Sequence, residues 1–182
     1  MRVLGIDPGT IRMGYGIVEE DGRDLKLIGC GVVSAPPKAP IEARLLKIFR
    51  GLQQLLDLYH PNAVAVEEPF VVQSPRKSAM AVGEARAVAL LAAAQRDIPV
   101  FQYGPSKVRS VVADYGGSDK EQVRTMVSLL LGGVSLDGHA LDASDALAVA
   151  ICHLRQAEVN ALLAESPLAG ALNPKPRRRA AR

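Results

Sequence analysis

Four acidic residues stand where the sequence predicts the ends of strands or the start of a helix. Asp7 closes the apolar run RVLGID, and Glu67 closes a second run, AVAVE. Asp142 and Asp145 lie three residues apart in LDASDALAVAI. An acid that ends a buried strand is poorly solvated, so it needs a cation or hydrogen-bond donors nearby. Carboxylates from three segments can hold two divalent cations about 4 Å apart, and their oxygens suit Mg²⁺ or Mn²⁺.

Each of these acids also has an ordinary structural interpretation. Asp7 can simply cap a turn, and Glu67 and Glu68 can be solvated strand-end acids. Alternation puts Glu67 and Glu68 on opposite faces of a strand, so at most one of them points into a given site. The helix dipole favours two acids at a helix start, although their spacing also places Asp142 and Asp145 on one side of the helix. The combination of segments favours a shared metal site.

The elements that must position these acids follow from hydrophobic periodicity and turn signals. Strands are expected at 2–7, 14–20, 25–34, 63–68 and 98–103, and helices at about 40–59, 78–96, 105–113, 119–131 and 142–158. Three strands in succession predict an antiparallel meander, and the later alternation predicts parallel pairing. The fold class is therefore α/β, with a five-stranded mixed sheet covered by helices on both faces. Gly83 in the Ala-rich helix at 78–96 indicates that this helix packs closely.

Composition places the chain among globular proteins with one domain. It has 182 residues, of which 48% are hydrophobic, so an intrinsically disordered chain is excluded. Residues 173–182 carry five basic side chains and no acid, which leaves 17 basic against 19 acidic residues elsewhere. We expect a globular domain at 1–158 and a flexible basic tail at 159–182. No segment predicts a membrane span or a leader, and no disulfide framework is expected, so a cytoplasmic location is predicted.

Five segments together resemble a known family. They are LGIDPGT at 4–10 with GYG at 14–16, AVEEPF at 65–70, GEARA at 83–87, PVFQY at 99–103 and LDASDALAVAICH at 141–153. In this order they resemble the RuvC family of crossover junction endodeoxyribonucleases, which has the ribonuclease-H-like fold. The resemblance covers roughly residues 1–155 and does not extend to the basic tail.

The resemblance implies a structure-selective endonuclease that resolves Holliday junctions during DNA recombination and repair. It implies that Asp7, Glu67, Asp142 and Asp145 are the catalytic acids and the ligands of Mg²⁺ or Mn²⁺, two ions for each site. Hydrolysis would leave a 5′-phosphate. Because a four-way junction has near two-fold symmetry, two symmetric cuts are expected from a homodimer, with the helix at 78–96 as a candidate interface. The branch-migration proteins RuvA and RuvB are the implied partners.

Candidate DNA contacts include one aromatic and six basic residues. The resemblance implies that Phe70 stacks on bases at the opened crossover, which we favour over the alternative of a core residue. Arg109 and Lys120 match positions where the family places lysines that contact phosphate. The basic candidates are Arg76, Lys77, Arg86, Lys107, Arg109 and Lys120. Each alone is ordinary surface charge, but several facing one acidic pocket would form a DNA track.

Two alternatives from other classes stay open on the sequence. GIDPGT also resembles the first phosphate loop of actin-like ATPases and sugar kinases, although the chain shows no second related domain. A non-catalytic module that binds junctions is the other alternative. ATP binding tests the first, and loss of cleavage with retained binding in Asp7→Asn tests the second.

Overall fold

The computed structural model describes residues 1–68, 76–113, 116–117 and 119–165, without the side chains of residues 76–78 and 165. The strands are β1 (Arg2–Asp7), β2 (Arg12–Asp21), β3 (Asp24–Ser34), β4 (Ala63–Glu67) and β5 (Val100–Tyr103). The helices are α1 (Ile41–Tyr59), α2 (Arg76–Ala94), α3 (Pro105–Ala113), α4 (Lys120–Leu130) and α5 (Leu141–Glu165). None of the described helices is long and apolar enough to cross a membrane.

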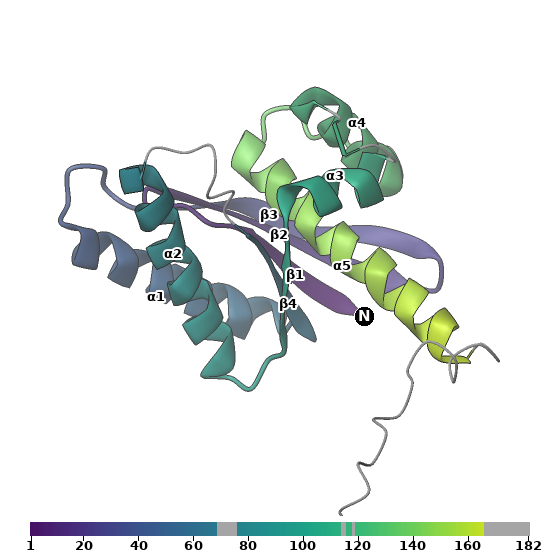
Figure 1. Cartoon of the computed structure of the whole chain (residues 1–182), viewed down its shortest axis with the longest axis horizontal. Helices are drawn as coiled ribbons and strands as arrows, with labels where there is room; N and C mark the ends of the chain where they lie inside the picture. The colour runs from purple at the N-terminus through teal and green to yellow at the C-terminus, as the bar shows by residue number, and fades with distance from the viewer. Residues whose placement is uncertain (69–75, 114–115, 118, 166–182) are drawn as a thin grey trace, which may run out of the picture.

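The described strands form one mixed five-stranded sheet in the order β3-β2-β1-β4-β5. β1, β2 and β3 form the predicted antiparallel meander, while β4 and β5 run parallel to β1. α1 and α2 cover one face, and α5 covers the other with α3 and α4 packed beside it (Figure 1). The predicted α/β class and the mixed sheet with helices on both faces are confirmed.

The central strands are apolar throughout because each of their faces lies under a helical layer. In β1, Val3 packs into the core beneath α5, and Leu4 packs into the opposite core beneath α1 and α2. Ala63 and Val64 of β4 divide in the same way. Side chains that alternate between two buried faces give a continuous hydrophobic run. An acid at the end of such a strand therefore lies at the rim of a core.

Glycines allow α5 to lie directly on the sheet backbone. A Cβ at Gly5 would come within 2.0 Å of the Ala146 carbonyl oxygen, and one at Gly14 within 1.9 Å of the Asp142 carbonyl oxygen. No side chain fits at either position while the helix keeps its place. The glycines of β1 and β2 thus fix how closely the first turns of α5 approach the end of β1.

The last helix is longer than the sequence predicted. α5 ends at Glu165, so the predicted boundary at 158 between the domain and its tail falls inside this helix. Its burial changes near that boundary, since Leu154 is fully buried whereas Leu162 is exposed. Residues 166–182, with the basic cluster, lie outside the described part of the chain.

The expectation that Gly83 marks close packing is wrong. A Cβ at Gly83 would meet nothing within 4 Å. α2 instead packs on the sheet through small residues on another face, including the buried Ala85, Ala89 and Ala92. The small residues correctly predicted that α2 packs closely on the sheet, but Gly83 itself faces away from the core.

The glycine contacts predict opposite effects for two identical substitutions. Gly14→Ala forces Asp142 away from β2 and should lower the free energy of unfolding by about 1–3 kcal/mol or more. Gly83→Ala, the matched control, meets open space in a helix and should raise it by up to about 1 kcal/mol. Urea denaturation of both variants checks this. Equal effects would contradict the close approach of α5 to Gly14.

Candidate active site

The ends of β1 and β4 lie side by side, and each carries an acid. Ile6 pairs with Val66 in parallel register, so Asp7 and Glu67 occupy the next row of the sheet. Ile6 and Val66 pack beneath α1 and α2, so alternation turns the two acids toward α5. The carboxyl groups interact directly, since Asp7 forms a side-chain hydrogen bond with Glu67.

The first turn of α5 brings two more acids to this row. Gly14 pairs with Asp7 across the β1–β2 ladder, and the backbone of Asp142 lies directly on Gly14. The charges of Asp142 and Asp145 both act on Asp7. Residues far apart in the chain therefore meet in one cluster, which we call the acid pocket: Asp7, Glu67, Asp142 and Asp145. All four predicted acids are brought together, and their catalytic role remains a prediction.

Burial and like charge give Asp7 an unusual pKa. Burial is the largest cause, followed by the charges of Glu67 and of the two α5 acids, and together they raise the Asp7 pKa from 3.8 to about 8. Burial and then Asp145 raise the pKa of Glu67, while the hydrogen bond from Asp7 lowers it. The surroundings therefore favour the protonated, neutral form of Asp7, which a nearby cation would reverse.

Basic side chains approach the acids from three elements. Lys120 at the start of α4 contacts Asp145 with Nζ 2.7 Å from Oδ2, and Arg12 at the start of β2 contacts Asp142 with Nε 2.8 Å from Oδ2. The hydrogen bond to Asp145 raises the pKa of Lys120. Arg109 on α3 lies close enough for its charge to lower the pKa of Glu67. The α5 acids thus have direct cationic partners, whereas burial and neighbouring charge raise the pKa of both strand acids.

The donor set fits divalent cations. Four carboxylates lie near one another at the ends of β1 and β4 and the start of α5, and oxygen ligands of this kind suit Mg²⁺ and Mn²⁺. Within the described residues, no three His, Cys, Asp or Glu side chains form a closed metal centre as they stand. The carboxylates of Asp142 and Asp145 are instead paired with Arg12 and Lys120.

A neutral aromatic pair flanks the acids on the β5 side. Tyr103 pairs with Glu67 in the sheet, and its hydroxyl lies 2.8 Å from Nδ1 of the buried His153 on α5. Burial raises the pKa of Tyr103 to about 12 and lowers the pKa of His153. Both groups are therefore uncharged at neutral pH, and they fasten the end of β5 to α5 beside Glu67.

The structure separates the predicted DNA contacts into groups. Arg109 and Lys120 face the acids, whereas Lys107 is exposed on α3. Arg86 on α2 hydrogen-bonds to Gln102. Gln102 precedes Tyr103 in β5, so its side chain lies on the opposite face of the sheet from Tyr103 and the four acids. Phe70 lies outside the described residues, as do the side chains of Arg76 and Lys77.

Arg12 is a site residue that the sequence analysis missed. Its signal was available, because Arg12 precedes Gly14 by two positions and alternation places both on the face beneath α5. However, that signal has a meaning only when Gly14 is known to lie beneath Asp142. Long-range packing supplies this information, and local sequence does not.

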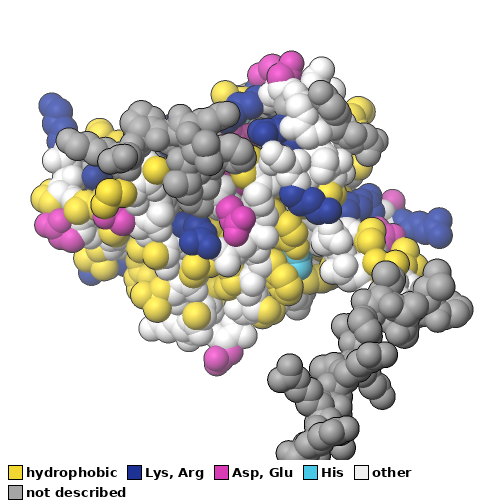
Figure 2. All heavy atoms as spheres, in the orientation of Figure 1, with side chains coloured by type: hydrophobic (Ala, Val, Ile, Leu, Met, Phe, Trp, Pro, Cys, Tyr) yellow, Lys and Arg dark blue, Asp and Glu magenta, His cyan; other side chains and the backbone are white. Residues whose placement is uncertain are grey.

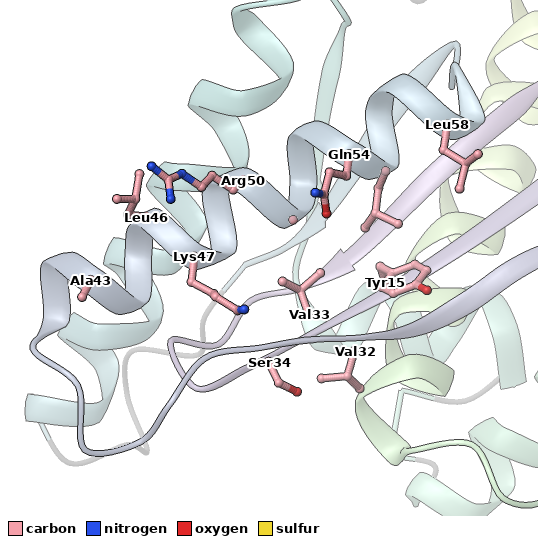
Figure 3. A pocket seen from close by; sticks show the side chains of 12 residues that line it. Tyr15, Val32, Val33, Ser34, Ala43, Leu46, Lys47, Arg50, Gln54 and Leu58 are labelled. Carbon is pink, nitrogen blue, oxygen red and sulfur yellow. The ribbon is translucent and has the colours of Figure 1, made fainter.

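A separate groove lies away from the acids. It has a volume of about 850 Å³ and runs between α1 and the β2–β3 strands (Figure 3). Lys47 and Arg50 line it beside apolar residues such as Leu46 and Leu58, and none of its lining residues is acidic. It therefore lacks the ligands for metal-dependent chemistry, and the acid pocket remains the candidate site.

The strand order, the helices on both faces and the acids at the ends of β1 and β4 define a ribonuclease-H-like domain. The chain belongs to the RuvC family, since the family model for the crossover junction endodeoxyribonuclease RuvC matches residues 3–153. RuvC of Dehalococcoides mccartyi is 46% identical over 168 residues, covering 92% of this chain and 99% of that protein. RuvC of Chloroflexus aggregans is 48% identical over 153 residues, covering 84% of this chain and 92% of that protein.

Solved structures support the same assignment. The structure of Thermus thermophilus RuvC in complex with a Holliday junction substrate has a TM-score of 0.81 at 34% identity, covering 88% of this chain and 96% of that one. The yeast mitochondrial Holliday junction resolvase Ydc2 shares the fold, with a TM-score of 0.64 at 14% identity. The predicted family and fold are thus confirmed, and the enzyme class is crossover junction endodeoxyribonuclease rather than ATP-binding protein.

The raised pKa of Asp7 predicts how stability depends on pH without metal. The folded state holds the Asp7 proton up to about pH 8, whereas an unfolded aspartate loses it near 3.8. Rising pH therefore destabilises the fold across this range. Asp7→Asn removes the cost of ionising a buried carboxyl group. In EDTA at pH 7.5 the free energy of unfolding of this variant should therefore exceed that of the parent by at least about 1 kcal/mol, with a smaller gain at pH 5.

Urea denaturation at both pH values measures the difference. Asp24→Asn, at an exposed position at the start of β3, is the matched control and should change little. A gain for Asp7→Asn that is the same at both pH values would contradict the excess of charge in the pocket.

Proposed function

We propose that this chain resolves Holliday junctions by metal-dependent hydrolysis of DNA phosphodiesters at the acid pocket. The observation that carries the proposal is the convergence of Asp7, Glu67, Asp142 and Asp145 from β1, β4 and α5 at one half-buried position. The match to RuvC relatives over most of the chain supplies the substrate class. It also connects the reaction to DNA recombination and repair.

Two divalent ions bound there would supply an activated water and neutralise the charge that develops on the leaving oxygen. Asp7 is the acid best placed to lie between them, because it interacts with Glu67 on one side and with the α5 acids on the other. Glu67, Asp142 and Asp145 would complete the ligand set. The sheet end and the start of α5 hold these carboxylates on rigid backbone, so little ordering is needed when DNA arrives.

Arg109 and Lys120 would hold the scissile strand over the acids. Both charges act on the acid row from α3 and α4, and guanidinium and ammonium groups bind phosphate oxygens well. Lys107 extends this basic surface on α3. Contacts from Phe70, Arg76, Lys77 and Arg86, and a contribution from the basic tail, remain predictions.

A homodimer would provide the two symmetric cuts, and α2 supplies a candidate interface. Met80 and Leu91 are 69% and 62% exposed, and Ala87 and Ala94 are exposed on the same side of the helix. Hydrophobic side chains, in yellow, gather over this part of the surface in Figure 2. Glu84 is also exposed on this side of the helix, so the stripe is apolar apart from one acid, and such a stripe is typical of a protein interface. RuvA, RuvB and a cytoplasmic location follow only from the family and stay predictions.

Substitution of Asp7 tests the catalytic proposal. Asp7→Asn should lower Mg²⁺-dependent cleavage of a synthetic four-way junction by about 1000-fold or more, because several kcal/mol of charge stabilisation are lost. Junction binding should persist, and Asp24→Asn should cleave normally. The parent should cut the junction far faster than a linear duplex of the same arms. Normal cleavage by Asp7→Asn would disprove the metal site, and equal cutting of both substrates would disprove junction selectivity.

Substitution on α2 tests the dimer. Leu91→Asp places a charge in the proposed interface and should convert a dimer into a monomer, as measured by light scattering after size exclusion. Leu129→Asp is the matched control, because Leu129 on α4 is 61% exposed and lies outside the stripe. The proposal fails if the parent is monomeric, or if Leu91→Asp stays dimeric.

A further inference from the structure

Arg12 holds one of the proposed metal ligands in an ion pair. Its Nε lies 2.8 Å from Oδ2 of Asp142, which lies in the first turn of α5. The two residues are 130 positions apart in the chain, so the fold and not local sequence brings them together. The Arg12 side chain is 52% exposed and the Asp142 side chain 34%. An ion pair with this exposure is worth little energy and opens easily.

The backbone that carries Arg12 is closely constrained. A Cβ at Gly9 would come within 2.1 Å of the Arg12 carbonyl oxygen, so the turn between β1 and β2 requires glycine there. The carbonyl of Ile11 accepts a hydrogen bond of 2.8 Å from the amide of Ala35. Arg44 donates to the buried Thr10 in the same turn. These contacts fix the backbone of Arg12, so its side chain projects from a defined position beside Asp142.

The two α5 acids differ in their relation to the strand acids. Asp145 acts electrostatically on both Asp7 and Glu67, whereas Asp142 acts on Asp7 only and more weakly than Asp145 does. Asp142 is thus the outlying carboxylate of the pocket. An ion on its side has fewer carboxylates already nearby, and Arg12 competes directly for one of them.

We propose that Arg12 is a positioning residue that sets the affinity of the acid pocket for its second divalent cation, by holding Asp142 until that ion displaces it. This inference rests on the proposed metal site. Arg12 would leave the side of Asp7 and Glu67 free for a first ion, and it would release Asp142 to a second ion only when the Arg12–Asp142 pair opens. Arg12 thereby keeps the pocket partly neutralised and ordered when only one ion is present.

Calorimetric titration of the full chain with Mn²⁺ tests this inference without relying on catalysis. The parent should bind one ion tightly and a second ion more weakly. Arg12→Gln should tighten the weaker site by about fivefold, as expected for removal of a weak competing pair, with the tighter site little changed. Arg12→Lys keeps the charge and should resemble the parent. Arg23→Gln, an exposed arginine in the β2–β3 turn, is the control for loss of one positive charge.

Circular dichroism at the titration temperature establishes that each variant is folded. An unchanged second site in Arg12→Gln would overturn the inference, as would equal tightening in Arg23→Gln or Arg12→Lys. Failure of the parent to bind Mn²⁺ at all would instead overturn the proposed metal site and the inference with it. A tighter second site in Arg12→Gln alone would support both.

Discussion

The close contact between α5 and the glycines of β1 and β2 is the constraint on which the site depends. The Asp142 carbonyl occupies the space that a side chain on Gly14 would need, and Ala146 does the same at Gly5. This contact brings the N-terminal turn of one helix to the ends of two parallel strands. Acids from segments more than 70 residues apart then meet, as Glu67 and Asp145 do. A helix one side-chain layer further from the sheet would leave them separated.

The same contact makes the site unfavourable for the fold when no cation is present. Burial and like charges raise the pKa of Asp7 to about 8, so the pocket keeps a proton that a free aspartate would lose. Lys120 and Arg12 offset part of this charge by holding the α5 acids. The rest of the sheet stabilises the arrangement, since both cores are closely packed around fully buried residues such as Ile6 and Leu147. The proposed function thus depends on buried carboxyl groups that lower the stability of the fold.

Much of the fold could be predicted from the sequence because its signals are local. Alternation and turn residues predicted the five strands and their class, and motif order indicated the family that the comparisons confirm. The acids could be named for the same reason. Arg12 could not, because its role depends on which helix covers Gly14. The prediction for Gly83 was wrong for a related reason. Composition shows that a helix is rich in small residues, but it does not show which of them face the core.

Anomalous diffraction from crystals of the Mn²⁺-loaded protein tests the central claim most directly, because it locates the ions independently of any activity. The account predicts Mn²⁺ peaks roughly 2 Å from a carboxylate oxygen of Asp7, with Glu67 and the two α5 acids as further ligands. Peaks confined to other surfaces, with the carboxylates of Asp7 and Glu67 unliganded, would contradict it.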